Sequence, residues 1–378
     1  MNIGFDAKRV FHNRTGLGNY GRDLIRILGS IFPTNHYFLY NPKPGKSNLF
    51  NANFNWVTER MPNGRFWRFF YNLWRQYGIL YDLKKDKIDL YHGLSAELPV
   101  GISRTGIKSV VTVHDLIFLR FPQFYTAIDA WIYRKKTGYA VKNADLVVAI
   151  SKQTRQDIID FYKVDPAKIR VVYQGCQQVF QQPMDEETRL SVVARFKLPG
   201  SFILNVGTIE QRKNLLSVVK AIEDLDTWLV VVGSETPYAK EVKAYITSRG
   251  MESKIIFLKG LTSIELAALY KSATVFVYMS LFEGFGIPIV EALFSGTPVV
   301  TSKGGCFAEA GGHAALYADP ANIDEIKETI LKALNNNEMR QNMRQNGLEY
   351  ARQFTDENIG KKYMALYEEI ASTKSSYY

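Results

Sequence analysis

Short apolar runs alternate with helix-like patterns along most of the chain. Runs rich in β-branched and aromatic residues, bounded by glycine, proline or polar residues, predict buried strands. The predicted strands are residues 3–5, 37–40, 90–91, 109–113, 146–150 and 171–173 in the first half, and 202–206, 229–232, 255–258, 275–278 and 299–301 in the second. Strands that alternate with helices are typical of parallel sheets built from βαβ units. The pattern therefore predicts an α/β protein.

Two sets of strands of similar size predict two domains, since 378 residues are too many for one ordinary core. A polar stretch separates the sets, and we place the first domain at 1–175, a linker at 176–200 and the second domain at 201–355. Residues 356–378 are expected to form a helix that docks through one apolar face, made of Ile359, Tyr363, Met364, Tyr367 and Ile370. A ligand site between the two domains is the natural expectation.

The composition narrows the class of protein. The two cysteines, Cys176 and Cys306, are too few for a disulfide framework or a four-thiolate zinc site, which favours the cytoplasm. No apolar run approaches the ~18 residues of a membrane span, and the N-terminus resembles a strand rather than a signal peptide. The net charge of +10 favours anionic partners, which include nucleotide phosphates, acidic glycans, anionic lipids and nucleic acid.

The clearest chemical signal is residues 283–291, which read Glu-Gly-Phe-Gly-Ile-Pro-Ile-Val-Glu. They follow a predicted strand, and Pro288 suits the first position of a helix that would carry Glu291 in its first turn. Strand, glycine loop and helix N-terminus together present backbone N–H donors at the carboxyl edge of a sheet. The carboxylates of Glu283 and Glu291 would repel phosphate but can accept hydrogen bonds from hydroxyl groups. A ligand with phosphates and many hydroxyls, such as a nucleotide sugar, fits this segment.

Two further loops are candidates for phosphate binding. Arg212 and Lys213 follow strand 202–206 and precede a helix expected to begin near Asn214, so cations and a helix N-terminus would meet there. The alternative is a solvated basic turn. Residues 16–21 match G-x-G-x-x-G, but no acidic residue follows ~20 positions later, as a dinucleotide site requires. A glycine loop that lets backbone approach a phosphate or an acceptor is favoured over that site, and a structural turn stays open.

Two histidines and one aromatic segment are candidates near the acceptor. His114 and His92 each follow a predicted buried strand, although a lone histidine is more often structural than catalytic. Residues 65–75 interleave arginines with aromatic residues, among them Trp67 and Arg68. Such a segment can meet an acceptor, a membrane surface or single-stranded nucleic acid, or it can be a packed helix beside the site. Residues 131–136 repeat the basic and aromatic character without deciding among these alternatives.

Taken together, these motifs resemble the retaining glycosyltransferases of family 4, and the resemblance covers nearly the whole chain. The motifs that carry it are the Gly16/Gly18 loop, His114-Asp115, Ala149-Ile150-Ser151 with Thr154, Gly207 with Arg212-Lys213-Asn214, Gly260-Leu261-Thr262, and Glu283 with Glu291. The resemblance implies the GT-B architecture, an α/β fold of two Rossmann-like domains whose parallel sheets face each other across a cleft. It also implies a C-terminal helix that packs back toward the N-terminal domain.

Roles for individual residues follow from the same resemblance. His114, Arg212, Lys213 and Glu283 are the expected catalytic residues: the cations hold the diphosphate, Glu283 binds donor-sugar hydroxyls, and His114 contacts the sugar near its reacting face. Glu291 is expected to bind the ribose hydroxyls. The remaining donor-binding positions are Gly16, Gly18, Gly207, Lys259, Gly260, Leu261 and the backbone amides of Phe285, Gly286 and Ile287. The N-terminal domain is expected to bind the acceptor, with His92, Trp67 and Arg68 as candidate contacts. One departure is Gln174-Gly175, where the family usually has Asn-Gly.

The expected activity is transfer of a hexose from a nucleoside-diphosphate sugar, GDP-mannose-like or a UDP-sugar, to a glycan or lipid-linked glycan. Retention of configuration is implied by the resemblance alone. No metal or other cofactor is expected, since the single Asp-x-Asp triplet, residues 224–226, lies between a helix and a strand. A cytoplasmic enzyme in contact with the anionic inner face of the membrane, without a nucleic-acid partner, completes this hypothesis. The alternatives are a nucleotide-sugar epimerase on the same frame and a non-catalytic basic protein that binds acidic glycan or nucleic acid.

Overall fold

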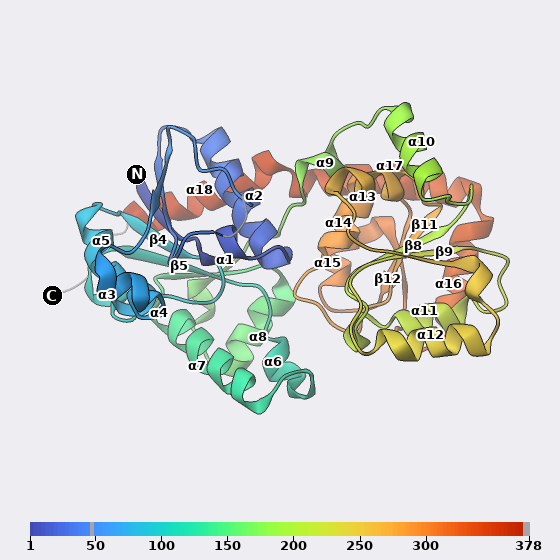
Figure 1. Ribbon diagram of the computed structural model, residues 1–378, viewed down its shortest axis with the longest axis horizontal. Helices are drawn as coiled ribbons and strands as arrows, with labels where there is room; N and C mark the ends of the chain where they lie inside the picture. Colours follow the sequence, from blue (N-terminus) through green and yellow to red (C-terminus); the bar gives the residue numbers. More distant parts are fainter. Residues whose placement is uncertain (46–48, 373–378) are drawn as a thin grey trace. The chain divides into compact units, whose positions relative to one another are not determined.

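The computed structural model describes residues 1–45 and 49–372. The chain forms two units (Figure 1): the first holds Met1–Gln174 and the chain from Asp356 onward, and the second holds Gly175–Thr355. Residues 176–200, predicted as a linker, belong to the second unit and contain the helices α9 (Gln178–Gln181) and α10 (Glu186–Arg195). These short helices bury Phe180 and Val192, which explains why the polar stretch is folded.

Among the described residues, the first unit contains a sheet of seven parallel strands in the order β3-β2-β1-β4-β5-β6-β7. Their bounds are β1 Asn2–Asp6, β2 His36–Tyr40, β3 Val57–Arg60, β4 Leu90–Gly93, β5 Lys108–Val113, β6 Leu146–Ala149 and β7 Ile169–Val171. The strand order reverses between β1 and β4. In open α/β sheets this switch point, at the carboxyl ends of the strands, is where ligands bind.

Helices cover both faces of this sheet, and alternate residues of each strand enter one of two apolar cores. The helices of the first unit are α1 Lys8–His12, α2 Gly16–Ile31, α3 Gly64–Phe69, α4 Tyr71–Leu73, α5 Ile79–Lys85, α6 Ile117–Arg120, α7 Ala127–Asn143, α8 Lys152–Tyr162 and α18 Asp356–Ser372, with a π-helical turn at Trp74–Gly78 and 3₁₀ turns at Ile102–Arg104, Pro122–Phe124 and Pro166–Lys168. The apolar face of α18 enters the same core as α2. Figure 1 shows the two helices on the same side of the sheet.

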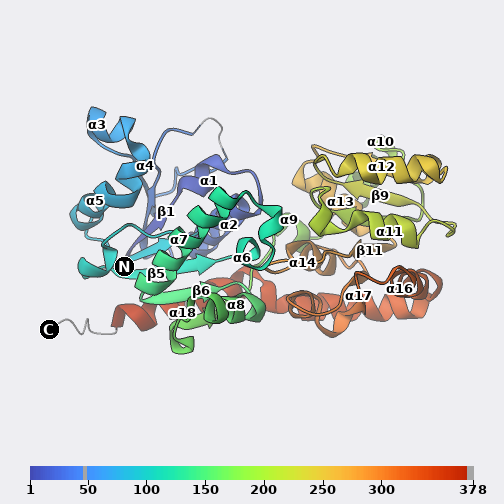
Figure 2. The ribbon, with the colours of Figure 1, turned by 90° about the horizontal axis from the view of Figure 1, so that it is seen from below.

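The second unit contains, within the described residues, six parallel strands in the order β10-β9-β8-β11-β12-β13. They are β8 Ile203–Val206, β9 Leu229–Val232, β10 Ile255–Leu258, β11 Val275–Tyr278, β12 Val299–Ser302 and β13 Ala315–Ala318. Besides α9 and α10, its helices are α11 Leu215–Ala221, α12 Ala239–Ser248, α13 Ser263–Ser272, α14 Ile287–Phe294, α15 Phe307–Gly311, α16 Ile323–Asn335 and α17 Asn337–Ala351, with 3₁₀ turns at Gln211–Lys213, Glu252–Lys254, Gly312–Ala314 and Arg352–Phe354. The switch point lies between β8 and β11, and Figure 2 gives a second view of these elements.

Most predicted strands are present, but one edge strand of each sheet was missed. Strands β3 and β13 were not predicted, because β3 buries only Val57 and β13 is half-buried and rich in alanine. Strand β7 ends at Val171, so residues 172–173 lie beyond it. Helix α14 begins at Ile287, one residue before Pro288, which places Glu291 in its second turn rather than its first.

Candidate functional site

In the second unit, three of the charged residues of the predicted donor site lie together. Arg212 and Lys213 form a 3₁₀ turn after β8, and Glu283 lies in the loop after β11. Strands β8 and β11 are neighbours at the switch point, so the carboxyl ends of the two strands bring the cations to the carboxylate. The Lys213 ammonium lies 2.5 Å from Glu283 Oε1, and Arg212 Nη1 lies 2.7 Å from Glu283 Oε2.

Neighbouring groups hold this cluster in place. Lys213 also donates to the hydroxyl of Tyr278 at 2.5 Å, and that hydroxyl donates to Glu283 Oε1 at 3.0 Å. Arg212 donates to the carbonyl of Phe282 at 2.7 Å and to Glu210 Oε1 at 2.5 Å. Both oxygens of the Glu283 carboxylate are therefore engaged by cations. The sequence predicted that Glu283 binds hydroxyls of the donor sugar, and it did not predict these ion pairs.

Charge–charge attraction keeps the cluster ionised. Burial alone would raise the pKa of Glu283, but the attraction of Lys213 and Arg212 outweighs it and lowers that pKa to about 2. Burial works against the charge of Lys213 as well, yet Glu283 raises the pKa of the ammonium above its ordinary value. All three side chains are therefore charged at neutral pH. Their charges sum to a net positive charge when the neighbouring carboxylate of Glu210 is not counted.

The glycine loop after β8 approaches this cluster closely. Gly207 has φ of 148°, in a region that favours glycine. A Cβ at this residue would lie 3.7 Å from the Lys213 side chain, and one at Gly233 would lie 1.9 Å from the Gly207 carbonyl oxygen. A side chain at Gly233 would therefore push the loop away from β9, whereas at Gly207 the positive φ, rather than lack of space, disfavours a side chain. The predicted place of Gly207 beside the cations agrees with this geometry.

The loop between β11 and α14 rests on a buried thiol. Cys306 donates to the carbonyl of Phe285 at 2.5 Å and to that of Glu283 at 3.3 Å. Burial raises the pKa of Cys306, so the sulfur remains a protonated donor. Phe285 itself is buried against Phe354, with ring centroids 5.7 Å apart. Gly286 caps α14 and has little room for a side chain, since a Cβ there would lie 3.1 Å from Ala310. Sequence reasoning had no signal for Cys306.

The second glutamate of the motif is held by a tyrosine. The buried Tyr270 hydroxyl on α13 donates to Glu291 Oε2 at 3.0 Å. Burial raises the pKa of Tyr270, so it keeps its proton and orients the half-buried carboxylate. Lys259, Gly260 and Leu261 follow β10, the edge strand, so β9 separates that strand from β8. They share the carboxyl edge of the sheet with Arg212, and Gly260 has φ of 72°.

In the first unit, His114 lies directly after β5 and is held on both sides of its ring. Nε2 lies 2.8 Å from the carbonyl oxygen of Leu94, and Nδ1 lies 2.9 Å from the amide nitrogen of Gln174. The ring also packs against that of Tyr20 at a steep angle of 84°, with centroids 4.6 Å apart. Burial lowers the pKa of His114 to about 4, so the ring is neutral near pH 7.

The glycines of G-x-G-x-x-G lie in a helix rather than in a loop. Gly16 and Gly18 belong to the first turn of α2, whose N-cap is Thr15. A Cβ at Gly18 would lie 2.0 Å from the carbonyl oxygen of Asn13, whereas Gly16 has open space around it. Gly18 therefore permits the turn at 13–15 to pack closely on α2, which is the structural alternative left open by the sequence.

The three candidate acceptor residues have different surroundings. His92 is fully buried, with Nδ1 2.6 Å from the Tyr367 hydroxyl and Nε2 2.8 Å from Thr112 Oγ1, which gives it no surface for an acceptor. Burial also lowers the pKa of His92 to about 3. Trp67 is half-buried against the core, while Arg68 is exposed. The structural interpretation of His92 is therefore the one that the contacts support.

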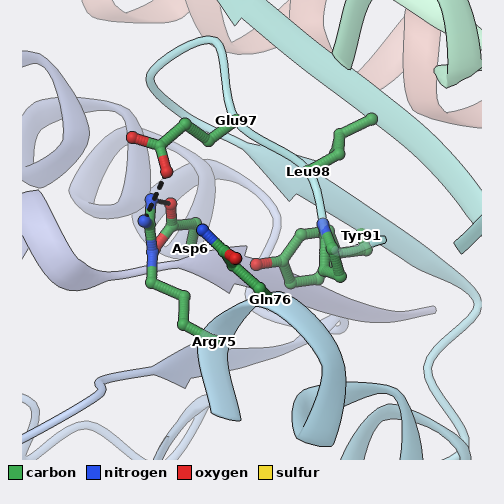
Figure 3. Close-up of a pocket in the computed structure, with 7 residues that line it drawn as sticks. Asp6, Arg75, Gln76, Tyr91, Glu97 and Leu98 are labelled. Atoms are coloured by element: carbon green, nitrogen blue, oxygen red, sulfur yellow. Dashed lines mark hydrogen bonds and ion pairs between the residues drawn. The ribbon is translucent and has the colours of Figure 1, made fainter. Parts of the chain in front are cut away.

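A polar pocket in the first unit was not predicted (Figure 3). It is lined by Asp6, Arg75, Gln76, Tyr91, Glu97, Leu98 and Pro99. Arg75 is buried and donates to Asp6 Oδ1 at 2.9 Å and to Glu97 Oε2 at 2.5 Å. Asp6 ends β1 and Glu97 follows β4, so the pocket lies at the switch point of this sheet. The sequence signal was an acidic residue directly after a predicted strand.

The described residues, 1–45 and 49–372, contain no candidate metal site and no candidate membrane span. No group of three or more histidine, cysteine, aspartate or glutamate side chains there is placed to hold a metal ion. Within the same residues, every helix is too short or too polar to cross a membrane.

Two units of parallel β-sheet, with charged loops at the switch points, form the GT-B architecture. Residues 38–177 match the protein family described as "Glycosyltransferase Family 4", and residues 188–350 match the family described as "Glycosyl transferases group 1". The chain belongs to family 4 of the glycosyltransferases, and the predicted fold, family and enzyme class are confirmed.

Relatives with assigned names support this membership. The O-antigen chain mannosyltransferase B of Escherichia coli is 26% identical over 97% of this chain and 100% of its own length. The O-antigen chain mannosyltransferase RfbU of Salmonella typhimurium is 29% identical over 59% of this chain and 63% of its own. A glycosyltransferase from Rickettsia africae superposes with a TM-score of 0.76 at 18% identity, covering 99% of both chains. Anabaena HepE in complex with UDP superposes with a TM-score of 0.74 at 15% identity, covering 97% of this chain and 99% of that one. The two superpositions concern the fold alone.

Proposed function

We propose that this enzyme transfers a hexose from a nucleoside-diphosphate sugar to a glycan or lipid-linked glycan, with retention of the anomeric configuration. The observation that carries the proposal is the cluster of Arg212, Lys213 and Glu283 at the switch point of the second unit. Departure of the nucleoside diphosphate builds negative charge on a phosphate oxygen, and fixed cations stabilise such charge most effectively when they need no rearrangement.

Glu283 supplies that rigidity. The carboxylate holds the Lys213 ammonium and the Arg212 guanidinium before a donor arrives. The contacts of the two cations do not use all of their N–H donors, so phosphate oxygens can join the cluster while the ion pairs persist. In this proposal Glu283 positions the cations as well as accepting a hydrogen bond from the donor sugar.

The other donor contacts follow the loops of the second unit. We assign the ribose hydroxyls to Glu291, whose carboxylate Tyr270 orients, and the phosphates to the backbone amides at 285–287. Lys259–Leu261 would flank the base, and His114 would contact the sugar. The mannosyltransferase names of the relatives favour a GDP-mannose-like donor, and the UDP of the Anabaena neighbour keeps a UDP-sugar as the alternative.

The chemical step is proposed to proceed without a metal ion or a protein nucleophile. The acceptor oxygen would attack the anomeric carbon from the same face as that from which the phosphate departs. The leaving phosphate would take the proton of the acceptor hydroxyl. The sugar–phosphate bond breaks, the new glycosidic bond forms, and the proton ends on the diphosphate.

A donor screen followed by a transfer assay tests this function. The melting temperature of the purified protein is measured with GDP, UDP and ADP and with their sugars, because specific binding to the folded state must raise it. The donor found in this way is incubated with a lipid-linked or soluble glycan, and NMR of the product reads the anomeric configuration. An inverted product would refute retention. A donor whose sugar changes without any acceptor would make the protein an epimerase instead.

We also propose that the first unit contacts an anionic membrane. Its segment 66–81 exposes six large apolar side chains, here called the aromatic face: Phe66, Phe69, Phe70, Leu73, Tyr77 and Tyr81. Phe69 and Tyr81 are 77% and 74% exposed. Four exposed cations lie within or close to this segment in the sequence: Arg65, Arg68, Lys84 and Lys85. Figure 2 shows α3 and α4 at an outer corner of the first unit. Apolar rings together with cations match an anionic bilayer, where lipid-linked acceptors reside.

Sedimentation with lipid vesicles tests the aromatic face. The protein should bind vesicles that contain phosphatidylglycerol, bind pure phosphatidylcholine less, and lose binding as salt rises. Phe66→Ser with Phe69→Ser should weaken binding at least about tenfold, since burying one phenylalanine contributes about 1.5–3 kcal/mol. Leu348→Ser, which removes a side chain that is 48% exposed in the second unit, is the matched control. Equal binding of both variants, or a dimer in light scattering that the Phe66 and Phe69 changes dissociate, would refute the membrane proposal.

A further inference from the structure

The contacts of His114 determine which of its ring nitrogens carries the hydrogen. Leu94 offers a carbonyl oxygen, which can only accept, so Nε2 must be protonated. The Gln174 amide nitrogen can only donate, so Nδ1 must keep its lone pair. Together the two contacts select the neutral tautomer with hydrogen on Nε2.

The opposite orientation of the Gln174 amide would require a charged ring. An amide oxygen facing Nδ1 needs a proton on that nitrogen, and with Nε2–H committed to Leu94 the ring would become an imidazolium. Burial opposes that charge, as does Arg9 from α1. Tyr20 from α2 and the neutral His92 from β4 add no negative charge, and the carboxylate of Asp115 accepts from the amide of Ile117 at 3.1 Å. The donor orientation of Gln174 is therefore the consistent one.

The identity of residue 174 makes this contact possible. Gln174 is 5% exposed and is the last residue of the first unit before the chain enters the second. Where the family usually has asparagine, the glutamine chain extends one methylene further, about 1.5 Å. An asparagine on the same backbone would leave its amide beyond hydrogen-bond distance of Nδ1, which Gln174 reaches at 2.9 Å.

We propose that Gln174 is a positioning residue, whose amide N–H holds His114 as the neutral Nε2–H tautomer beside the reacting sugar. The inference rests on the proposed function, in which His114 contacts the donor sugar. Positive charge develops on the sugar ring as the glycosidic bond breaks. A neutral imidazole adds no repulsion there, whereas an imidazolium would oppose the transition state.

Gln174→Glu reverses the hydrogen-bond demand at Nδ1. A carboxylate can only accept, so it keeps the contact only if Nδ1 is protonated, and the pKa of His114 rises. In donor-free protein with ¹⁵N-labelled histidine, the wild-type ring should show one protonated and one bare nitrogen down to about pH 5, well below its ordinary pKa of about 6.5. In Gln174→Glu both nitrogens should be protonated up to above that ordinary pKa. His114→Asn assigns the signals, and Gln123→Glu, an exposed position in the first unit, should leave them unchanged.

Turnover gives the second measurement. Below the raised pKa, Gln174→Glu should lower kcat about tenfold, as is typical for the loss of a group that orients another. The loss should lessen as pH rises and the imidazolium loses its proton, while the donor KM changes little. Gln174→Asn should lower kcat without adding this pH dependence, and it remains informative if the glutamate variant does not fold.

The outcomes separate this inference from the proposed function. A wild-type ring with hydrogen on Nδ1, or a Gln174→Glu ring that titrates like the wild type, would overturn the role of Gln174. The NMR result stands even if the protein transfers no sugar, in which case the proposed function fails and the hydrogen-bond assignment is still decided. Wild-type kcat at every pH in both Gln174 variants would show that the tautomer has no role in the reaction.

Discussion

The Glu283 carboxylate ties the stability of the second unit to pH in a way that can be calculated. Its pKa is about 2 in the folded protein against an ordinary value of 4.5. A change of one in the pKa corresponds to about 1.4 kcal/mol of folding free energy. The lowered pKa of Glu283 therefore means that its ion pairs contribute about 3 kcal/mol at neutral pH. The side chain is 13% exposed, so solvent screening reduces this little. Because the folded-state pKa is lowered, this stability is present above about pH 4.5 and is lost as the pH falls toward about 2.

Glu283→Gln removes the charge and keeps the shape. At neutral pH the variant should be about 3 kcal/mol less stable than the wild type, since two buried cations lose their partner. The gap should shrink by about 2 kcal/mol on going to about pH 3, where much of the wild-type contribution has been titrated away. Urea unfolding followed by circular dichroism, fitted as two transitions for the two units, measures the gap.

A matched control isolates the ion pairs from a general effect of charge. Glu328→Gln removes an exposed carboxylate of α16 in the same unit and should change the stability by less than about 0.5 kcal/mol at either pH. A Glu283→Gln gap below about 1 kcal/mol at neutral pH would refute the reasoning. An equal gap at both pH values would also do so, because it would mean that Glu283 does not titrate with the pKa on which the argument rests.

Three further predictions concern turnover. Arg212→Ala should lower kcat about a hundredfold, by analogy with the loss of one oxyanion donor. Arg195→Ala, at an exposed arginine of the same unit, should leave kcat unchanged, and initial-rate assays measure both. Activity should survive EDTA, and a loss that Mg²⁺ or Mn²⁺ restores would refute metal independence. Tyr270→Phe should raise the donor KM more than it lowers kcat, because Glu291 loses the hydrogen bond that orients it. The affinity for the nucleoside diphosphate, measured by titration calorimetry, should fall in parallel.

The fold was predictable because parallel strands buried on both faces are nearly continuous apolar runs. The strands at 229–232, 255–258 and 275–278 were predicted with the bounds that the structure has. The edge strands β3 and β13 were not predicted, because both bury little apolar surface: β3 reads Val-Thr-Glu-Arg. The glycines at 16 and 18 predicted a loop but lie in the first turn of α2. A helix N-terminus tolerates glycine as well as a loop does, and the neighbouring residues do not distinguish a loop from a helix start.

Within the candidate site, the sequence indicated which loops carry charge but not which charges meet. Lys213 and Glu283 are separated by 70 positions, and they pair because β11 lies next to β8 in the sheet. Strand order of this kind is absent from a single sequence. The sequence therefore allowed Glu283 to be treated as a free acceptor of hydroxyl hydrogen bonds, whereas the fold assigns both of its oxygens to cations.

His92 demonstrates the same limit and leads to a last prediction. Its Nδ1 lies 2.6 Å from the hydroxyl of Tyr367, which is 275 positions away on α18, so the first unit is completed by the distant end of the chain. Tyr367→Phe leaves this buried nitrogen without its partner and should destabilise the first unit by about 1–3 kcal/mol in urea unfolding. Tyr81→Phe, at a side chain that is 74% exposed, should have an effect below about 0.5 kcal/mol. If the two variants unfold at the same urea concentration, this hydrogen bond contributes nothing to holding α18, and the other contacts of the helix secure it.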